Sequence, residues 1–319
     1  FYLGDNMLLS VIVPMYNEEE IAAKTYTTLV DVLKDLEYEL LFINDGSTDK
    51  TREILENLIP EDSPHKVLSF SRNFGHQAAF SAGLNHAQGD AVVIIDGDLQ
   101  DPPELILEML SKWREGYHVV YAQRRKRQGE SWFKLITARW FYRILNSLTS
   151  IKIPVDTGDF RLMDRAVVDN INRLPERSRF LRGLVCWVGF KHTGIQYDRA
   201  KREAGTTKYP LRKMMGLAID GITSFSTAPL KFSLVLGMWA TAISFALGVW
   251  SFAQKLLHPT TTTDGWASII IAVVFLGGVQ LITIGILGEY IGRIYEEIKQ
   301  RPLYILDKSS RGKKYDMDS

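Results

Sequence analysis

Two long apolar runs near the C-terminal end restrict what this chain can fold into more than any other feature. The first, Phe232 to Ala253, has 22 residues without a charged side chain, and the second, Trp266 to Gly288, has 23. About 20 apolar residues span a bilayer as a helix, whereas helices of soluble cores seldom run so long uncharged. A buried hairpin of a soluble protein is the alternative. The lengths favour two transmembrane helices joined by a short turn over Gln254 to Gly265.

Basic residues flank this hairpin on both outer sides. The turn between the runs has only Lys255, His258 and Asp264 as ionisable residues. The flanking bases are Lys208, Arg212, Lys213, Lys231, Arg293, Lys299, Arg301, Lys308 and Arg311. Cytoplasmic flanks of membrane helices carry an excess of Lys and Arg, so we expect the N-terminal domain and the C-terminal tail in the cytoplasm.

The first 125 residues alternate short β-rich runs with amphipathic helical patterns, which indicates an α/β domain with a mainly parallel sheet. We expect strands over Leu8–Met15, Tyr38–Asn44, Lys66–Ser71, Ala91–Asp96 and His118–Ala122. We expect helices over Glu18–Leu36, Asp49–Ile59, His76–Ala87 and Pro103–Glu115.

The stretch 124–143 interleaves basic and aromatic side chains. Its apolar stripe at helical spacing is formed by Phe133, Ile136, Trp140, Ile144 and Leu148. A basic amphipathic helix of this kind suits an anionic membrane surface. The alternative is a core-packing helix with solvated arginines, and Arg143, close to the apolar stripe, weakens the interfacial interpretation.

Overall charge and cysteine content exclude some classes of protein. The formal net charge of +1 gives no sign of a nucleic-acid-binding protein. Cys186 is the one cysteine, so no internal disulfide can form, and a reducing compartment is the natural interpretation.

Carboxylates follow the apolar strand pattern that ends near residue 95. Asp96, Asp98, Gln100 and Asp101 come directly after it, in VVIIDGDLQDPP. Carboxylates at positions i and i+2 leaving a strand can converge on one divalent cation, and such a cation assists departure of a diphosphate. An ordinary acidic turn is the alternative.

The loops after the first two expected strands are also polar. Pro14, Tyr16 and Glu18 end the first strand where a dinucleotide-binding fold needs glycines, and the sequence has neither G-x-G-x-x-G nor a Walker-A pattern. A nicotinamide-dependent oxidoreductase is therefore disfavoured. Asp45, in NDGSTD, can accept hydrogen bonds from a ribose or a base edge, or it can belong to an ordinary turn with a helix N-cap.

Six motifs occur in order over residues 14 to 165: PMYNE, NDGSTD, SRNFG, AGLNHAQGD, DGDLQDPPE and DTGDFRLMDR. In this the chain closely resembles the family-2 glycosyltransferases of the dolichol-phosphate-mannose-synthase type, most of all bacterial polyprenyl-phosphate glucosyltransferases with two C-terminal membrane helices. The resemblance covers nearly the whole chain. It divides the chain into a cytoplasmic GT-A domain (1–208), an interfacial helix (209–231), the hairpin (232–288, with spans 232–253 and 266–288) and a cytoplasmic tail (289–319).

The resemblance implies a nucleotide-sugar donor, an Mg²⁺ or Mn²⁺ ion and a location in the bacterial inner membrane. By position, Pro14, Tyr16, Glu18 and Asp45 would line the nucleoside pocket. The metal and, through it, the donor diphosphate would be held by Asp96, Asp98 and Gln100. Arg202 and Lys208, in REAGTTKY, match a stretch of the family that contacts donor or acceptor phosphates. His76 stands where the family often has lysine, which puts a phosphate contact there in doubt.

The implied acceptor, a polyprenyl phosphate, is already anionic and attacks the anomeric carbon without strong base assistance. The site must instead gather two polyanions and stabilise the leaving diphosphate. Arg124 and Arg139 are the candidates for holding the acceptor phosphate. Asp156 and Asp159 are the candidates for orienting or deprotonating the acceptor, with a turn and a local salt bridge to Arg161 or Arg165 as the alternative. A single displacement would invert the anomeric centre.

Other functions remain open at this point. Processive polysaccharide synthases carry Q-x-x-R-W, but here Ile136 precedes Arg139 and Trp140 at the glutamine position. An inactive membrane scaffold is a second alternative, disfavoured by the intact acidic motif. Glucose from UDP-glucose is the donor that the resemblance favours, against GDP-mannose, UDP-N-acetylhexosamine and aminoarabinose donors.

Small residues recur at four-residue spacing in both apolar runs. Ala240, Ser244 and Gly248 form one ridge, and Gly288 and Gly292 form another. Such ridges let helix backbones approach closely in lipid. One ridge can serve the hairpin itself, which leaves the other for a neighbouring subunit. We therefore expect a homo-oligomer with contacts in the membrane.

Overall fold

The computed structural model describes residues 7–60, 62–125, 157–177, 179–198, 226–257 and 266–307. Some predicted features lie outside these residues: the basic and aromatic stretch beyond residue 125, most of the segment 209–231, the turn at 258–265 and the tail beyond residue 307. Four predicted site residues, Arg139, Asp156, Arg202 and Lys208, also lie outside them.

A seven-stranded sheet forms the centre of the N-terminal domain, in the order β3-β2-β1-β4-β6-β5-β7. Neighbours from β3 to β4 run parallel, β6 is antiparallel to β4 and β5, and β7 is parallel to β5. The predicted mainly parallel α/β fold of the GT-A type is confirmed. The strands are β1 (Leu8–Met15), β2 (Glu37–Asn44), β3 (Lys66–Ser69), β4 (Ala91–Ile94), β5 (Val119–Arg124), β6 (Thr157–Asp164) and β7 (His192–Tyr197).

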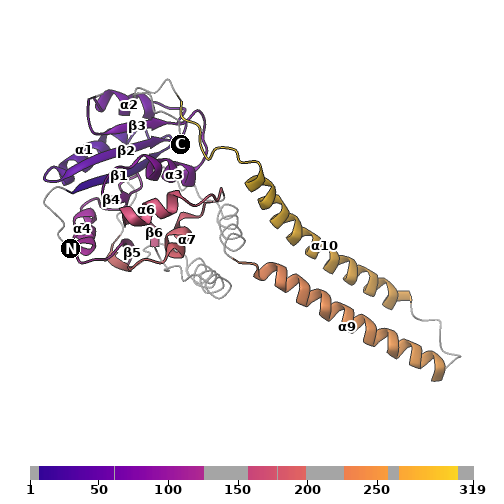
Figure 1. Cartoon of the computed structure of the whole chain (residues 1–319). Coiled ribbons are helices and arrows are strands. Elements are labelled where there is room, and N and C mark those ends of the chain that lie inside the picture. The colour runs from indigo at the N-terminus through magenta and orange to yellow at the C-terminus, as the bar shows by residue number, and fades with distance from the viewer. Residues whose placement is uncertain are drawn as a thin grey trace.

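Helices cover both faces of this sheet (Figure 1). One face packs against α1 (Ala22–Leu33), α2 (Thr51–Leu58) and α4 (Leu105–Arg114). The other packs against α3 (His76–His86), α6 (Arg165–Asn172) and α7 (Leu181–Val188). A sheet covered on both faces needs apolar side chains at successive positions, which explains the continuous apolar runs of β1 and β2.

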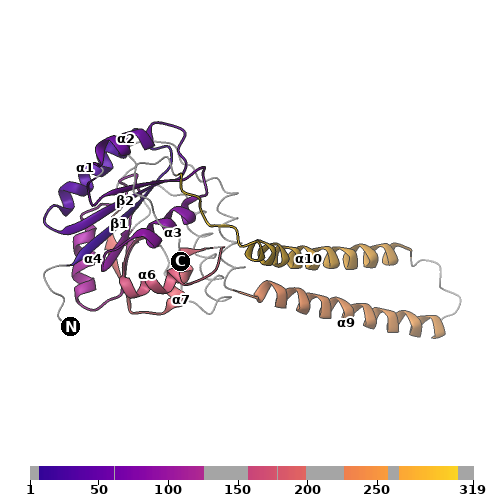
Figure 2. The ribbon, with the colours of Figure 1, turned by 45° about the horizontal axis from the view of Figure 1, so that its top comes forward.

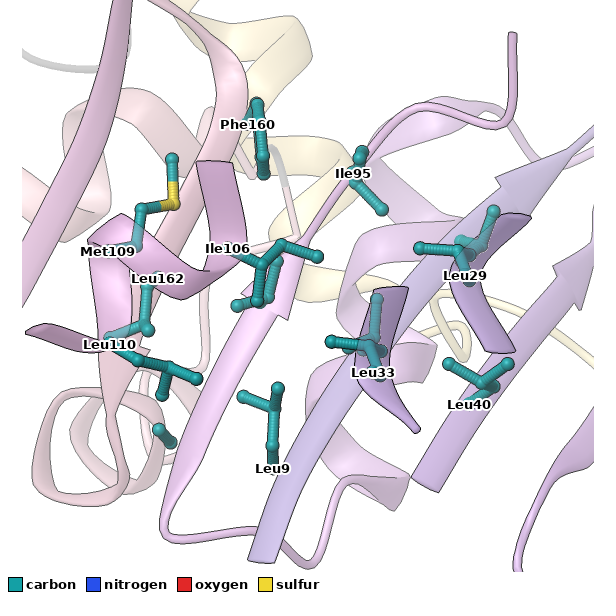
Figure 3. Close-up of a cluster of buried hydrophobic side chains, with 14 of the residues drawn as sticks. Leu9, Leu29, Leu33, Leu40, Ile95, Ile106, Met109, Leu110, Phe160 and Leu162 are labelled. Carbon is teal, nitrogen blue, oxygen red and sulfur yellow. The ribbon is translucent and has the colours of Figure 1, made fainter. Parts of the chain in front are cut away.

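The core is split by the sheet into two clusters because side chains alternate along each strand. Leu9, Val11 and Val13 of β1 point into the first cluster, whereas Ile12 points into the second. Figure 3 shows the first cluster, where Leu29 and Leu33 of α1 and side chains of α4 meet the strands. The alternation fixes the register of the central strands and therefore the level at which each one ends.

The start of α1 differs from the expectation. The helix begins at Ala22, not at Glu18. Asn17 adopts a left-handed conformation with φ 53°, and the backbone N–H of Glu18 donates to Thr51 Oγ1 at 2.9 Å. The residues after β1 therefore form a loop tied to the N-terminal end of α2, because the side chains there offer acceptors that compete with helix formation.

Two long helices, α9 (Ala228–Leu257) and α10 (Trp266–Ile298), extend away from the domain as a hairpin (Figures 1 and 2). The segments Ala228–Trp250 and Ala272–Ile298 are long and apolar enough to cross a membrane, each with a mean hydropathy of 1.8. Only 11% and 6% of their most apolar windows are buried in the structure, so these helices do not form the core of a soluble domain. The predicted hairpin is confirmed, and the protein is membrane-associated.

Candidate active site

Three polar loops lie together at one edge of the sheet. They follow β1, β2 and β4, and β1 pairs in parallel with both of the other strands. The carboxyl ends of neighbouring parallel strands lie at the same edge, which is where open α/β sheets bind their ligands. The motifs PMYNE, NDGSTD and DGDLQDPP occupy these loops.

The loops after β1 and β2 are joined by hydrogen bonds. The N–H of Asn17 donates to Ser47 Oγ at 3.0 Å, and the N–H of Thr48 donates to Asn17 Oδ1 at 2.9 Å. Pro14 is buried in β1, whereas Tyr16 is 40% exposed at the loop. The paired loops therefore form one rigid unit that presents the Tyr16 ring at its surface.

Asp45 joins this unit to the SRNFG loop (residues 71–75). Its carboxylate accepts hydrogen bonds from the N–H groups of Phe74 at 2.7 Å and Gly75 at 3.0 Å. Burial raises the pKa of Asp45, and these N–H groups oppose part of that rise. Gly46 has φ +64°, and a Cβ there would lie 2.3 Å from the backbone carbon of Arg72, so only glycine fits between the two loops.

The acidic loop after β4 is held in a constrained conformation. Leu99 adopts a left-handed conformation with φ 51°, and Asp98 Oδ1 accepts from the N–H of Gln100 at 3.2 Å. Thr25 of α1 donates from Oγ1 to the carbonyl of Gly97 at 2.8 Å. A left-handed non-glycine residue costs about 1–3 kcal/mol and is concentrated at functional sites.

The side chains of this loop supply some, but not all, of the ligands that a hard divalent cation needs. Asp96, Asp98 and Gln100 offer carboxylate and amide oxygens, the ligands that Mg²⁺ and Mn²⁺ prefer. Within the described ranges, no group of three or more His, Cys, Asp and Glu side chains is placed to hold a metal. Mg²⁺ is commonly bound by one or two carboxylates together with substrate phosphates, and the loop fits that mode.

A row of alternating charges runs from the acidic loop across the sheet. His76, at the start of α3, places Nε2 at 3.3 Å from Asp96 Oδ1 and 3.9 Å from Asp159 Oδ2. Asp159 in turn accepts two hydrogen bonds from Arg182 of α7, both at 2.7 Å. Arg161 Nη2 lies 3.9 Å from Asp159 Oδ1.

These neighbours decide the charge states of the row. Burial alone would raise the pKa of the Asp159 carboxyl, but the charge and hydrogen bonds of Arg182, with Arg161 and His76, hold that pKa well below its usual range. Burial alone would lower the pKa of His76, but Asp96 and Asp159 outweigh it and raise that pKa. Asp159 is therefore a buried anion at neutral pH.

The main partner of Asp159 differs from the sequence alternative of a local salt bridge. Arg182, not Arg161 or Arg165, makes the bidentate contact, and Arg165 lies 3.7 Å from Asp169. No sequence pattern pointed to Arg182, because it lies in a helix that no motif marked. From the sequence His76 was notable only as a replaced lysine, and its place between two carboxylates was not predicted.

Arg124 lies at the end of β5 and is held by Asp101 and Tyr197. Its Nε donates to the Tyr197 hydroxyl at 3.3 Å, its Nη2 lies 4.0 Å from Asp101 Oδ1, and Tyr197 also donates to Asp101. Burial and the Asp101 carboxylate raise the pKa of Tyr197 to about 12. A Cβ at Gly158 would lie 3.3 Å from Arg124 Nη2, so the guanidinium lies over the strand that carries Asp159.

The described part of the chain therefore places Tyr16, Glu18, Asp45, Asp96, Asp98 and Gln100 on the three strand-end loops, and Pro14 near the carboxyl end of β1. It places Asp159 and Arg124 on neighbouring strands, β6 and β5. Cations and carboxylates thus alternate at an edge where polar loops converge, which is a site able to hold a ligand with several phosphates.

Comparison with known proteins agrees with this arrangement. The model of the family described as glycosyl transferase family 2 matches residues 10–171, which include the three loops and Asp159. The chain belongs to glycosyl transferase family 2. The GtrB C-terminal hairpin model matches residues 228–294, which is the region of α9 and α10. The resemblance found in the motifs is confirmed, and this family-2 glycosyltransferase is an enzyme of the hexosyltransferase type.

Several relatives match the glycosyltransferase over almost its full length. The uncharacterized glycosyltransferase YkcC of Bacillus subtilis is 53% identical over 94% of this chain and 93% of its own length. The uncharacterized glycosyltransferase sll0501 of Synechocystis is 49% identical over 93% and 94%. The bactoprenol glucosyl transferase of Shigella phage SfII is 47% identical over 96% and 99%.

Proposed function

We propose that this glycosyltransferase transfers one glucosyl residue from UDP-glucose to undecaprenyl phosphate, with inversion, at the cytoplasmic face of the bacterial inner membrane. In support of this, a single chain combines a site able to hold a ligand with several phosphates and a membrane hairpin. A bactoprenol glucosyl transferase is similar to it over both parts. A lipid acceptor requires an enzyme that stays at the bilayer, and the hairpin supplies that anchor.

The donor nucleoside is assigned to the unit formed by the first two loops. Tyr16 offers an exposed ring, with Glu18 on the same loop and Pro14 buried near the end of β1. Asp45 closes the pocket by holding the SRNFG loop through Phe74 and Gly75. Since the loops are already tied together, they bind the nucleoside with little further ordering.

Asp96, Asp98 and Gln100 are assigned to Mg²⁺ or Mn²⁺ and the donor diphosphate. Such a cation, when bound, neutralises the charge that develops on a departing diphosphate. Leu99, with its left-handed backbone, separates Asp98 from Gln100, and the N–H of Gln100 donates to Asp98 Oδ1. His76 Nε2 lies 3.3 Å from Asp96 Oδ1.

The acceptor phosphate is assigned to Arg124, with Arg139, Arg202 and Lys208 supplying further cations from outside the described residues. An oxygen of the lipid phosphate attacks the anomeric carbon, the bond from that carbon to the diphosphate oxygen breaks, and UDP leaves. Attack opposite to the leaving group inverts the anomeric centre. A phosphate monoester needs no base to become a nucleophile, so positioning is the main task of the site.

Asp159 fits the task of orienting the acceptor better than that of deprotonating it. A carboxylate held by two hydrogen bonds from Arg182, with a lowered pKa, is a weak base. It instead holds the guanidinium of Arg182 through two hydrogen bonds and lies 3.9 Å from His76 Nε2. Asp156, three residues earlier, is the other candidate for this role.

The experiment that tests the proposal offers the purified protein a panel of sugar nucleotides together with undecaprenyl phosphate. We expect glucosyl phosphoryl undecaprenol, identified by mass spectrometry, from UDP-glucose alone. A glycolipid formed only from GDP-mannose, a UDP-N-acetylhexosamine or an aminoarabinose donor would replace the assigned sugar. A panel without any lipid product would contradict the proposal.

We also propose that the protein is a homo-oligomer with contacts in the membrane. In the first ridge Ala240 is buried and Ser244 and Gly248 are exposed, whereas both Gly288 and Gly292 of the second ridge are exposed, with open space where a Cβ would stand. The Gly288 and Gly292 ridge is thus available for a neighbouring subunit. Gly288→Leu should reduce the mass of the detergent-solubilised particle in light scattering, and an active wild-type monomer would remove the idea.

A further inference from the structure

After the second membrane helix, α10, the chain returns to the N-terminal domain. Residues 301–307, which we call the return segment, come back to the sheet and pair with the chain beyond its edge strand β3. The N–H of Ser71 donates to the carbonyl of Ile305 at 2.9 Å, and the N–H of Asp307 donates to that of Ser69 at 2.8 Å. This pairing covers backbone groups that an edge would otherwise expose.

An aromatic stack continues from the return segment into the SRNFG loop. The Tyr304 ring lies parallel to that of Phe70, with centroids 5.1 Å apart and an interplanar angle of 12°. Phe70 meets Phe74 edge-on at 5.7 Å, and the Tyr304 hydroxyl accepts from Asn85 Nδ2 at 3.3 Å. Phe74 is the residue whose N–H binds Asp45 at 2.7 Å, so the stack reaches the backbone of the donor pocket.

Two further contacts fix the ends of the return segment. Asp307 forms an ion pair with Arg52 of α2, with Oδ2 and Nη1 2.7 Å apart. At the other end, Gln300 adopts a left-handed conformation with φ 49° just after α10 ends, and Glu297 of α10 accepts from the N–H of Arg177 at 2.9 Å. The membrane helix is therefore connected to the donor-site loop through a short segment held at both ends.

We infer that the return segment positions the SRNFG loop for nucleotide binding and that Tyr304 is the positioning residue. This inference rests on the proposed function, because it assigns the Asp45 pocket to the donor. A loop that receives an aromatic stack on one side and the Asp45 carboxylate on the other has few alternative conformations, which lowers the entropy cost of binding. Without the stack, Phe74 moves and Asp45 loses the N–H partners that orient it. The segment that follows the membrane anchor thereby contributes to donor affinity.

The test uses the full-length protein in detergent and measures the affinity for UDP with Mn²⁺ by calorimetry, together with KM and kcat for UDP-glucose. We expect Tyr304→Ala to raise the Kd for UDP and the KM for the donor by about fivefold, the effect of losing one stacked aromatic pair. The KM for the polyprenyl phosphate should stay unchanged. Asp307→Asn, a milder change at the half-buried ion pair with Arg52, should raise the same two constants by about twofold.

Two variants serve as matched controls. Ile305→Ala removes a side chain that is 51% exposed and keeps the backbone pairing, so the Kd for UDP should stay at the wild-type value. Tyr304→Phe keeps the ring stack and loses the hydroxyl that contacts Asn85, so its affinity for UDP should stay close to that of the wild type. These two variants separate the stack from general damage to the segment.

The inference is overturned if Tyr304→Ala lowers the melting temperature but binds UDP as the wild type does, since the role would then be structural only. It is also overturned if Ile305→Ala weakens UDP binding as much as Tyr304→Ala. These two outcomes overturn the inference and leave the proposed donor intact. A wild type that fails to bind UDP would instead contradict the proposed donor together with this inference.

Discussion

Replacement of Arg182 by glutamine should destabilise the folded protein strongly at neutral pH. Arg182→Gln leaves the carboxylate of Asp159, 8% exposed, without its bidentate partner. Removing one partner of a buried ion pair costs about 3–5 kcal/mol. Arg161 and His76 remain 3.9 Å away, and Arg182 itself is 21% exposed. We therefore expect about 3 kcal/mol, which lowers the Tm of a domain of this size by about 6–12 °C.

The pH dependence of this loss has a definite sign. The pKa of Asp159 is lowered in the folded wild type, so its contribution to stability is present above the ordinary pKa of about 4 and is lost as the pH falls through the lowered pKa. In Arg182→Gln the positive charge that lowers the pKa of Asp159 is gone, so burial raises that pKa relative to the wild type. The difference in Tm between wild type and variant should therefore be largest at pH 7 and shrink towards pH 4.

Thermal unfolding in detergent, followed by circular dichroism, measures this difference. Lys112→Gln is the matched control, because it removes one positive charge from an exposed pair with Glu115 and should leave the Tm close to the wild-type value. A double-mutant cycle of Arg182→Gln with Asp159→Asn should give a coupling energy of about 2 kcal/mol. A coupling near zero, or a Tm loss equal to that of Lys112→Gln, would refute the reasoning.

Three further predictions concern catalysis and topology. Asp98→Ala should abolish sugar transfer, because the diphosphate loses a cation ligand, while the Tm stays within about 2 °C of wild type; normal turnover at saturating donor would contradict the metal assignment. Tyr197→Phe removes the hydroxyl between Asp101 and Arg124 and should raise the KM for the lipid phosphate about fivefold, equivalent to about 1 kcal/mol, with the KM for UDP-glucose as the internal control. In a protein without Cys186, cysteines placed at 260–263 should react with an impermeant thiol reagent outside intact cells, and one at Ser309 should not; the reverse pattern would overturn the orientation.

The sequence predicted the sheet and the site loops well where one local signal decided the structure. Apolar runs such as Val11 to Val13 gave the parallel strands, because a strand buried on both faces needs apolar residues at successive positions. The polar motifs that follow such runs had to lie at one edge of the sheet. Asp45 and Asp98 were found in this way. The uncharged runs gave the membrane hairpin by length alone.

Contacts that depend on tertiary packing were not predictable from the sequence. Arg182 of α7 contacts Asp159, which lies 23 residues earlier in the chain, and no local sequence pattern marks a contact over that separation. His76 lies between two carboxylates only because α3 begins beside the acidic loop. In the sequence the return segment is only part of the expected cytoplasmic tail, and its pairing beyond β3 depends on where α10 ends in space.

Transfer of glucose to a lipid phosphate releases one UDP for each glycolipid, and this stoichiometry can be measured. The purified full-length protein is reconstituted with undecaprenyl phosphate and UDP-glucose, and released UDP is compared with glucosyl lipid formed. We expect one UDP for each β-glucosyl phosphoryl lipid, with the configuration determined by NMR, and no free glucose. UDP released with free glucose, or a lipid product of retained α-configuration, would contradict the proposed transfer.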